Sequence, residues 1–321
     1  MTSTASSSVA RHGGVRFVPS RMVIGLAAGI FAALVWATYL IAAKTGTAQG
    51  LMPQDIVLLR FTTAALVMLP WLLRHDPARL AGIGWRRAAI LATLAGPPFI
   101  ALSTGAYLFA PLAHGAVIQP STVTLASMAA AAVLLKERLT RDKLVGVALI
   151  VAGLAVIASH AQVMGNPRVW IGDLLFVAAG LSWAAFTVLL KRWSLDALAV
   201  TAAVSVVSAL VVVPLFVLRG DFSRIAALPM GALVAQIVVQ GVLSGVLAFV
   251  AFGVAVRHLG AAKAGLFPAI VPVATLLLGI PVTGNIPVGF EMIGAALATF
   301  GLVTAIGLVR ALFSSSPRTK G

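Results

Sequence analysis

Long apolar segments separated by short polar turns dominate the chain. Ten of them reach the roughly 20 residues that an α-helix needs to cross a bilayer. They predict helices at residues 22–43, 53–73, 87–112, 115–135, 144–162, 171–190, 197–218, 231–256, 261–282 and 288–309. Such segments are too long for buried strands, and their Gly and Ala content suits close packing of helices in lipid. We therefore predict an all-α membrane protein with ten transmembrane helices, in which Ala113 and His114 join the third to the fourth.

The composition supports a membrane environment. Of the 321 residues, 60% are hydrophobic and only 10% are charged, whereas about a quarter of a soluble domain is usually charged. The net charge is +15, but the basic residues lie singly or in small groups between apolar segments, so a nucleic-acid partner is not expected. The chain has no cysteine, which excludes disulfides, thiolate catalysis and Cys-ligated metals.

Lys and Arg are distributed unevenly between the two sides of the predicted bundle. With the N-terminus in the cytoplasm, 18 of the 23 basic residues fall in cytoplasmic loops and tails, and Arg60 lies within a helix. The outer side holds Lys44, Arg168, Arg219 and Arg224. Because basic residues favour the cytoplasmic side, we predict a multi-pass inner-membrane protein with both termini in the cytoplasm. Residues 1–20 are expected to form a disordered cytoplasmic tail, and residues 310–321 a second cytoplasmic tail.

The second half of the chain repeats the first. The segment LVWATYLIAAK at residues 34–44 matches LSWAAFTVLLK at residues 181–191 with an offset of 147. With an offset of 148, three further pairs align: Pro120 with Pro268, Gly146 with Gly294 and Gly153 with Gly301. Residues 22–162 and 171–309 therefore form two repeats of five helices. Because five is odd, the second repeat enters the membrane from the opposite side, which is typical of secondary transporters with a site at the repeat interface.

These residues also carry a family resemblance. The features concerned are Trp36 to Lys44, Arg60, Pro120, the turn at residues 135–139 followed by Gly146 and Gly153, and Gly172, Trp183 and Lys191. Each half resembles an EamA domain, and the chain from about residue 22 to 309 is similar to a two-domain member of the drug/metabolite transporter superfamily. The resemblance implies ten helices, an inverted five-plus-five repeat, cytoplasmic termini and alternating access. It leaves the substrate open, because the family includes exporters and importers of many metabolites.

The sequence departs from the superfamily's pattern at two places. Asn285 stands where the family has an acidic counterpart of Glu137, in a turn that inversion places outside. Residues 22–43 contain no acid, so the membrane-embedded Glu of the small multidrug members has no equivalent here.

Ionisable residues within the membrane are functional candidates by default. Arg60 can bind an anionic substrate group or pair across helices; the alternative is that it extends outward toward Asp55. Glu291 is a possible coupling acid, with an interfacial side chain in contact with water as the alternative. Lys44 and Lys191 end their helices on opposite faces, either as interfacial anchors or as gates.

Polar and aromatic side chains within the helices predict a substrate path. The candidates are Trp36, Tyr39, Arg60, Tyr107, Gln119, Pro120, Thr122, Trp183, Gln236, Gln240 and Pro268. Gln236 and Gln240 share one helix face because they are four residues apart, although Gln side chains can also join helices. Ser and Thr can instead bond their own helix carbonyls. Symmetric kinks at Pro120 and Pro268 would be hinges or static packing features.

Rival functional classes lack matching motifs. A membrane enzyme would need a catalytic cluster, but none of the five histidines has an acidic or His neighbour at metal-ligand spacing. The chain has no GxxxxGK[ST] loop, so ATP-driven transport by this chain alone is not supported. A channel would show rings of charge or repeated carbonyl filters, and the sequence shows neither. We predict a secondary transporter that moves an amino acid, nucleoside or drug-like solute, and we favour export over import. No cofactor or metal is expected. A membrane-embedded enzyme or a non-transporting scaffold is the alternative, and either a monomer or a homodimer fits.

Overall fold

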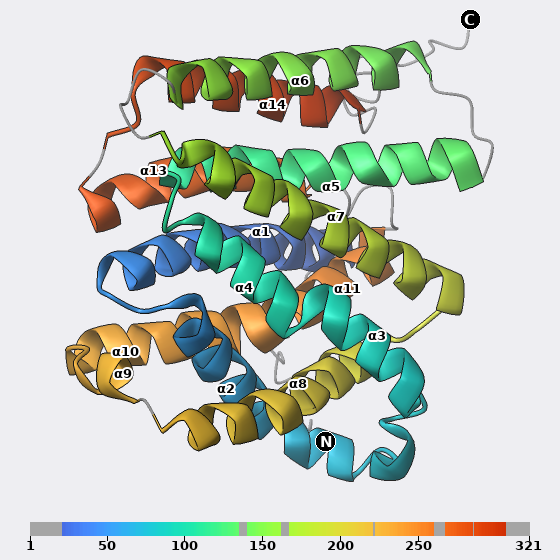
Figure 1. Ribbon diagram of the computed structural model, residues 1–321. Helices are drawn as coiled ribbons and strands as arrows, with labels where there is room; N and C mark the ends of the chain where they lie inside the picture. Colours follow the sequence, from blue (N-terminus) through green and yellow to red (C-terminus); the bar gives the residue numbers. More distant parts are fainter. Residues whose placement is uncertain are drawn as a thin grey trace, which may run out of the picture.

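The first half of the computed structural model is a chain of α-helices (Figure 1). The structure describes residues 21–134, 140–161, 167–220, 222–259, 267–284 and 286–305, and these ranges contain no strand. The helices are α1 (Arg21–Ala48), α2 (Pro53–Leu73), α3 (Trp85–Ala95), α4 (Pro97–Ala106), α5 (Leu112–Leu134) and α6 (Arg141–Ala161), with the short 3-10 helix η1 (Pro77–Arg79) before α3.

The second half is helical as well, so the all-α prediction is confirmed. Its elements are α7 (Val169–Trp193), α8 (Ala197–Arg219), α9 (Ser223–Ala226), α10 (Met230–Gln236), the π-helix η2 (Ile237–Leu247), α11 (Ala248–Leu259), the 3-10 helix η3 (Phe267–Ile270), α13 (Val271–Thr283) and α14 (Gly289–Ala305).

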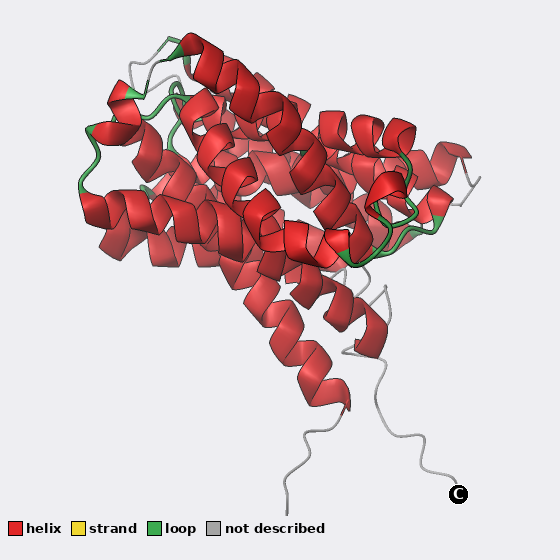
Figure 2. Ribbon diagram, turned by 90° about the horizontal axis from the view of Figure 1, so that it is seen from below, coloured by secondary structure: helices red, strands yellow, loops and turns green. Residues whose placement is uncertain are grey.

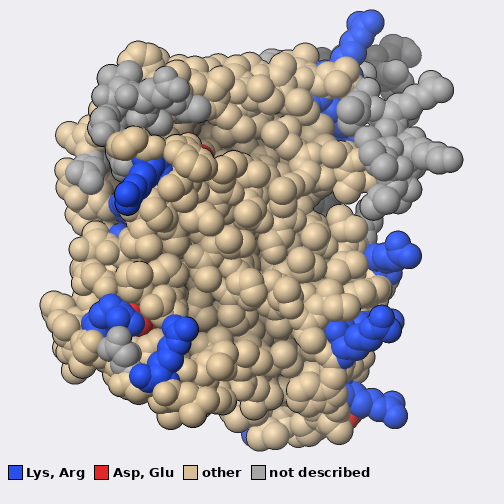
Figure 3. All heavy atoms as spheres, in the orientation of Figure 1, with Lys and Arg blue, Asp and Glu red and all other residues tan. Residues whose placement is uncertain are grey.

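The helices have the length and surface of membrane spans. Six stretches are long and apolar enough to cross a bilayer: Arg21–Ala48, Pro53–Leu73, Trp85–Ala106, Val169–Leu190, Ala197–Arg219 and Met230–Leu259. Helices α5 and α6 have 23 and 21 residues, and Phe267–Thr283 and Gly289–Ala305 are shorter apolar helices. Loops lie at the two ends of the bundle in Figure 2, and Figure 3 shows Lys and Arg gathered at both ends of a broad uncharged face. The surface is therefore that of a membrane protein.

The third predicted helix, residues 87–112, is two helices rather than one. It breaks at Gly96, because Pro97 and Pro98 carry no backbone N–H to continue the ladder of α3. The following turn also differs from the prediction. It spans residues 107–111, whereas Ala113 and His114 lie inside α5.

The eighth predicted helix, residues 231–256, is continuous from Met230 to Leu259 but widens into the π-helix η2 in its middle. The ninth is described from Phe267 onward, where it starts as a 3-10 turn. Several predicted features lie outside the described residues: both terminal tails, the turn at residues 135–139 and Asn285.

Contacts at the helix ends show that the two halves run in opposite directions. At the end of α1, the Nζ of Lys44 donates to the backbone oxygens of Tyr107 and Ala110, at 3.0 and 3.1 Å, just before α5 begins. His114, in the first turn of α5, lies 2.7 Å from Asp173, close to the start of α7. Helix α7 thus begins on the side where α1 ends, which we name the Lys44 end. The predicted inversion is confirmed.

Small residues let the last helices of the two repeats pack backbone to backbone. Helices α6 and α14 lie side by side (Figure 1). A Cβ on Gly301 would lie 2.8 Å from the backbone oxygen of Gly146, and one on Gly153 would lie 2.6 Å from that of Gly294. The four glycines of the two aligned pairs therefore pack across the repeat interface, Gly146 against Gly301 and Gly153 against Gly294, in the small-residue packing common among membrane helices.

Candidate functional site

A connected polar network runs through the middle of the bundle. The hydroxyl of Tyr39 in α1 donates to the Oγ of Ser103 in α4 at 2.9 Å, and Ser103 donates to the Oε1 of Gln119 in α5 at 2.8 Å. The ring of Tyr39 lies 5.2 Å from the guanidinium carbon of Arg60 in α2, within cation–π range. Ser103 thus links the predicted path residues Tyr39 and Gln119, and Tyr39 in turn contacts Arg60.

Arg60 connects this network to the second repeat. The side chain is 6% exposed. Its Nη1 donates to the backbone oxygen of Gln240 at 3.3 Å and to the Oγ of Ser244 at 3.1 Å, and its Nη2 donates to the backbone oxygen of Ser244 at 3.2 Å. Asp55 pairs instead with Arg224 at 2.7 Å. The alternative in which Arg60 extends toward Asp55 is therefore wrong, and the cross-helix contact is present.

The acceptors of Arg60 all lie in the π-helix η2. A π-helix bonds five residues back: the N–H of Ala248 donates to Leu243, and the hydroxyl of Ser244 donates to Val239 at 3.0 Å. Buried polar groups within a membrane must be satisfied by neighbouring groups, and two backbone oxygens of this stretch, those of Gln240 and Ser244, accept from Arg60. Stretches of π-helix often mark functional sites. The hydropathy and motif patterns of the sequence do not indicate this widening.

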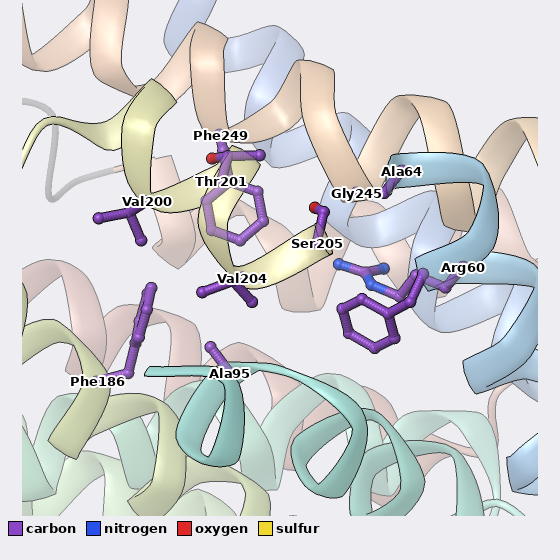
Figure 4. Close-up of a pocket in the computed structure, with 11 residues that line it drawn as sticks. Arg60, Ala64, Ala95, Phe186, Val200, Thr201, Val204, Ser205, Gly245 and Phe249 are labelled. Carbon is purple, nitrogen blue, oxygen red and sulfur yellow. The ribbon is translucent and has the colours of Figure 1, made fainter. Parts of the chain in front are cut away.

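A pocket lies beside Arg60, between the two repeats. The first repeat contributes residues of α2 and α3, and the second contributes residues of α7, α8, η2 and α11. The pocket is narrow, with about 20 Å³ of space for the centres of water-sized molecules, so its lining residues must move apart to admit a larger solute. In Figure 4, Arg60 extends from α2 toward Ser205 of α8. The location agrees with the repeat interface at which the sequence predicts a site.

Aromatic rings form one wall of the pocket. Phe186 and Phe249 line it, and both contact Trp183, with ring centroids 5.1 and 5.5 Å apart. Trp183 thus supports the wall from behind. Its counterpart Trp36 contacts Phe252 of α11 at 5.3 Å. Both predicted tryptophans therefore contact phenylalanines of α11.

The two glutamines of the eighth span behave differently. The Nε2 of Gln236 donates to the backbone oxygen of Ala42 at 2.8 Å, so this residue joins α10 to α1. Gln240 is fully buried, and neither atom of its amide has a hydrogen-bond partner among the described residues. A buried amide without partners is costly, so Gln240 is the better candidate for contact with a bound molecule or water.

The remaining path candidates lie apart from Arg60 or bond locally. Tyr107 closes α4 at the Lys44 end, where its ring contacts Phe176 at 4.9 Å. Thr122 donates to the backbone oxygen of Ile118 at 2.8 Å, which matches the alternative of bonding within its own helix. Pro120 lies inside the continuous helix α5, whereas Pro268 lies in the short 3-10 helix η3. The two prolines are therefore not in equivalent local structures.

Glu291 occupies a capping position. Its Oε2 accepts from the backbone N–H of Val288 at 3.0 Å in the first turn of α14, and the residue is 8% exposed. Helix α14 packs mainly against α6, away from the pocket. The geometry accounts for the carboxylate by local capping.

One contact between a buried histidine and a partly exposed aspartate was not predicted. The Nδ1 of His114, a residue that is 1% exposed, lies 2.7 Å from the Oδ1 of Asp173 in the other repeat. Because 59 positions separate the two residues, their spacing carries no local signal. No group of three potential metal-ligating side chains occurs among the residues that were described.

The inverted repeats and the buried polar site between them define a membrane transport protein. The chain belongs to the EamA-like transporter family, which it matches over residues 23–159 and 170–307. This confirms the two EamA repeats inferred from the sequence.

Known proteins support the same class. A Bacillus subtilis protein named uncharacterized transporter YyaM is 28% identical over 203 residues, which cover 61% of this chain and 65% of that protein. An uncharacterized transporter of Archaeoglobus fulgidus is 24% identical over 275 residues, covering 84% of this chain and 92% of the relative. A crystal structure with 21% identity has a TM-score of 0.61 and covers 91% of this chain and 98% of its own, which shows a shared fold. The protein is therefore a membrane transporter.

Proposed function

We propose that this transporter is a secondary active carrier that moves a small metabolite across the inner membrane by alternating access. The observation that supports this best is the buried site around Arg60, between repeats that run in opposite directions. In inverted-repeat carriers the substrate site lies near the bilayer midplane at the repeat interface. Arg60 is the eighth residue of the 21-residue helix α2, so it lies about 11 Å along the helix from its start.

The proposed moving parts are the two interruptions beside the pocket. Ala95, the last residue of α3, and Gly245 of η2 both line it. A break at glycine and proline, or a wide π turn, can absorb changes in backbone angles when domains move. Rocking of one repeat against the other would then open the pocket alternately toward the Lys44 end and toward the opposite end.

The proposed orientation places both termini in the cytoplasm and the Lys44 end outside, in keeping with the bias of Lys and Arg. We propose export as the direction, with an amino acid, a nucleoside or a drug-like solute as the cargo. The aromatic wall and neutral hydroxyls of the pocket support a small amphipathic solute.

Counterflow in proteoliposomes tests the proposal. The full chain is reconstituted without ATP, liposomes are loaded with one unlabelled solute, and uptake of the same labelled solute is followed for amino acids, nucleosides and organic cations. A carrier gives transient accumulation for at least one class, which protein-free liposomes do not show. Folded protein that accumulates none of the solutes contradicts the proposal.

The orientation is tested separately by a reporter fused after Ser316 that is active only in the periplasm. The expected result is an inactive reporter, with a fusion in the loop between α1 and α2 as the active control. Activity after Ser316 would place the C-terminus outside and overturn the orientation.

A further inference from the structure

Arg60 carries a buried charge that no described acid neutralises. A guanidinium has five N–H donors, and the hydrogen bonds to Gln240 and Ser244 use three of them. The acceptors are two carbonyls and a hydroxyl, all neutral. Two N–H groups therefore have no partner among the described residues.

Most acids of the described helices are engaged elsewhere. Asp55 pairs with Arg224, Asp173 with His114, and Asp196 and Glu291 cap their own helices: the carboxylate of Asp196 accepts from Leu198 and Ala199, and that of Glu291 from Val288. A buried cation without a counter-ion is costly in a low-dielectric interior. A ligand that brings a negative charge would supply the missing partner.

The residues that line the pocket restrict the class of ligand that can bind there. Besides Arg60, the polar lining consists of the hydroxyl residues Thr201 and Ser205, and the rest is apolar or aromatic, including Phe61, Phe186 and Phe249. The planar fork of an arginine matches the two oxygens of a carboxylate. One arginine without a lysine beside it suits a monoanion better than a phosphate, and the aromatic rings suit an apolar body.

We propose that Arg60 and this pocket form a binding subsite for a small organic monocarboxylate with an apolar or aromatic body. The inference rests on the proposed function, since it names the substrate class of the same site. The carboxylate binds the two free N–H groups, while the others continue to hold the carbonyls of η2. Binding in the pocket is thereby linked to the π-helix of the second repeat.

The first test compares ligands that share one body. Binding of phenylacetate, phenethylamine, 2-phenylethanol and benzylphosphonate to the detergent-purified full chain is measured by competition with labelled phenylacetate. The expected affinity for phenylacetate exceeds that for the amine and the alcohol by about tenfold or more, because only the carboxylate pairs with the guanidinium. Equal affinities for phenylacetate, amine and alcohol overturn the proposal. Tighter binding of benzylphosphonate than of phenylacetate overturns the assignment to monocarboxylates.

The second test changes the protein. Arg60→Gln and Arg60→Lys should each weaken phenylacetate binding by about tenfold or more, since a lysine cannot present the bidentate fork. Arg86→Gln, which removes the same charge from an exposed position in α3, is the matched control and should leave binding unchanged. Affinities of both Arg60 variants within twofold of the wild type overturn the proposal.

A variant that changes the pocket but keeps Arg60 tests the proposal even if the Arg60 variants misfold. Val204→Phe fills the pocket from α8 and leaves Arg60 in place. It should elute as wild type on size exclusion and lose phenylacetate binding; undiminished binding overturns the proposal.

Counterflow distinguishes failure of the carboxylate subsite from failure of the carrier function. Transport of some solute without preference for carboxylates refutes the subsite alone, whereas binding through Arg60 without counterflow of any solute refutes the carrier.

Discussion

The third membrane segment of each repeat is interrupted near its middle, but in different ways. In the first repeat the helix breaks at Gly96 and restarts at Pro97, whereas in the second it stays continuous and widens into the π-helix η2. With the offset of 148 between the repeats, Gly96 corresponds to Ser244. Two unrelated local devices thus interrupt the α-helix at the same place in the fold.

The residues opposite these interruptions differ in charge. Arg60 of α2 contacts η2, and its counterpart at the same offset is Ser208 of α8. The Oγ of Ser208 lies 2.7 Å from the position of a Cβ on Gly96, and this hydroxyl has no partner among the described residues. The scaffold is therefore symmetric, while its chemistry is not. Inverted symmetry allows a carrier two equivalent conformations. Arg60 places a positive charge on one side of the site, whereas its counterpart Ser208 is neutral.

The largest expected effect comes from removing that asymmetry at Arg60. Arg60→Gln should lower counterflow about 100-fold, equivalent to about 2.7 kcal/mol, because both the anion partner and the contacts to η2 are weakened. Initial rates of labelled phenylacetate counterflow give the measurement, normalised to reconstituted protein. A rate within threefold of the wild type would show that the charge difference between the repeats has no role in transport.

A smaller effect is expected from adding a methyl group at each interruption. Gly96→Ala should destabilise the protein by about 1–3 kcal/mol, because the new Cβ would lie 2.2 Å from the backbone oxygen of Ala92. At Gly245 the nearest atom is 3.1 Å away, so Gly245→Ala should cost less. Thermal unfolding in detergent compares the two variants. The reverse order would mean that η2 is the more tightly packed of the two interruptions.

Ser244→Ala should have a moderate effect. The change removes one acceptor of Arg60 and the bond from Ser244 to Val239, for a loss of about 0.5–1.5 kcal/mol. The backbone acceptors remain, so phenylacetate binding should fall by only a few fold. Unfolding curves and competition binding provide the measurements, and a loss as large as that of Arg60→Gln would transfer the main role to the hydroxyl.

Ser208→Ala should change least. Its hydroxyl has no partner within the described part of the chain, so replacing it removes an unsatisfied polar group and should leave stability unchanged or slightly higher. Counterflow within twofold of the wild type is expected. A transport defect here would reveal a functional group opposite the break at Gly96 and make the two sides more alike than their charges indicate.

Some parts of the site followed from sequence reasoning. Arg60, Tyr39, Gln119 and Trp183 were candidates because ionisable, polar and aromatic groups are unusual within membrane helices, and three of the four join one network. The same reasoning also selected Thr122, which bonds its own helix. Residue type alone cannot separate these cases, since it does not specify which way a side chain points.

The errors have local causes. Hydropathy predicts the third helix as one span because it does not register the break that Pro97 and Pro98 cause. Pro111 and Gly115 predict a turn at Ala113 and His114, but the turn lies at residues 107–111, and apolar residues continue on both sides of it. The sequence symmetry between Pro120 and Pro268 does not extend to their local structure, since Pro120 lies inside α5 and Pro268 lies in the 3-10 helix η3.

The sequence by itself determined the all-α class, the two repeats and the inversion, because segment length, apolar content and an odd helix count per repeat are properties of the chain alone. Only the tertiary structure decided the partner of Arg60, the π-helix and the pairing of His114 with Asp173. These depend on contacts between residues far apart in the chain. Their free energy comes from satisfying buried polar groups, which the local pattern of residues does not encode.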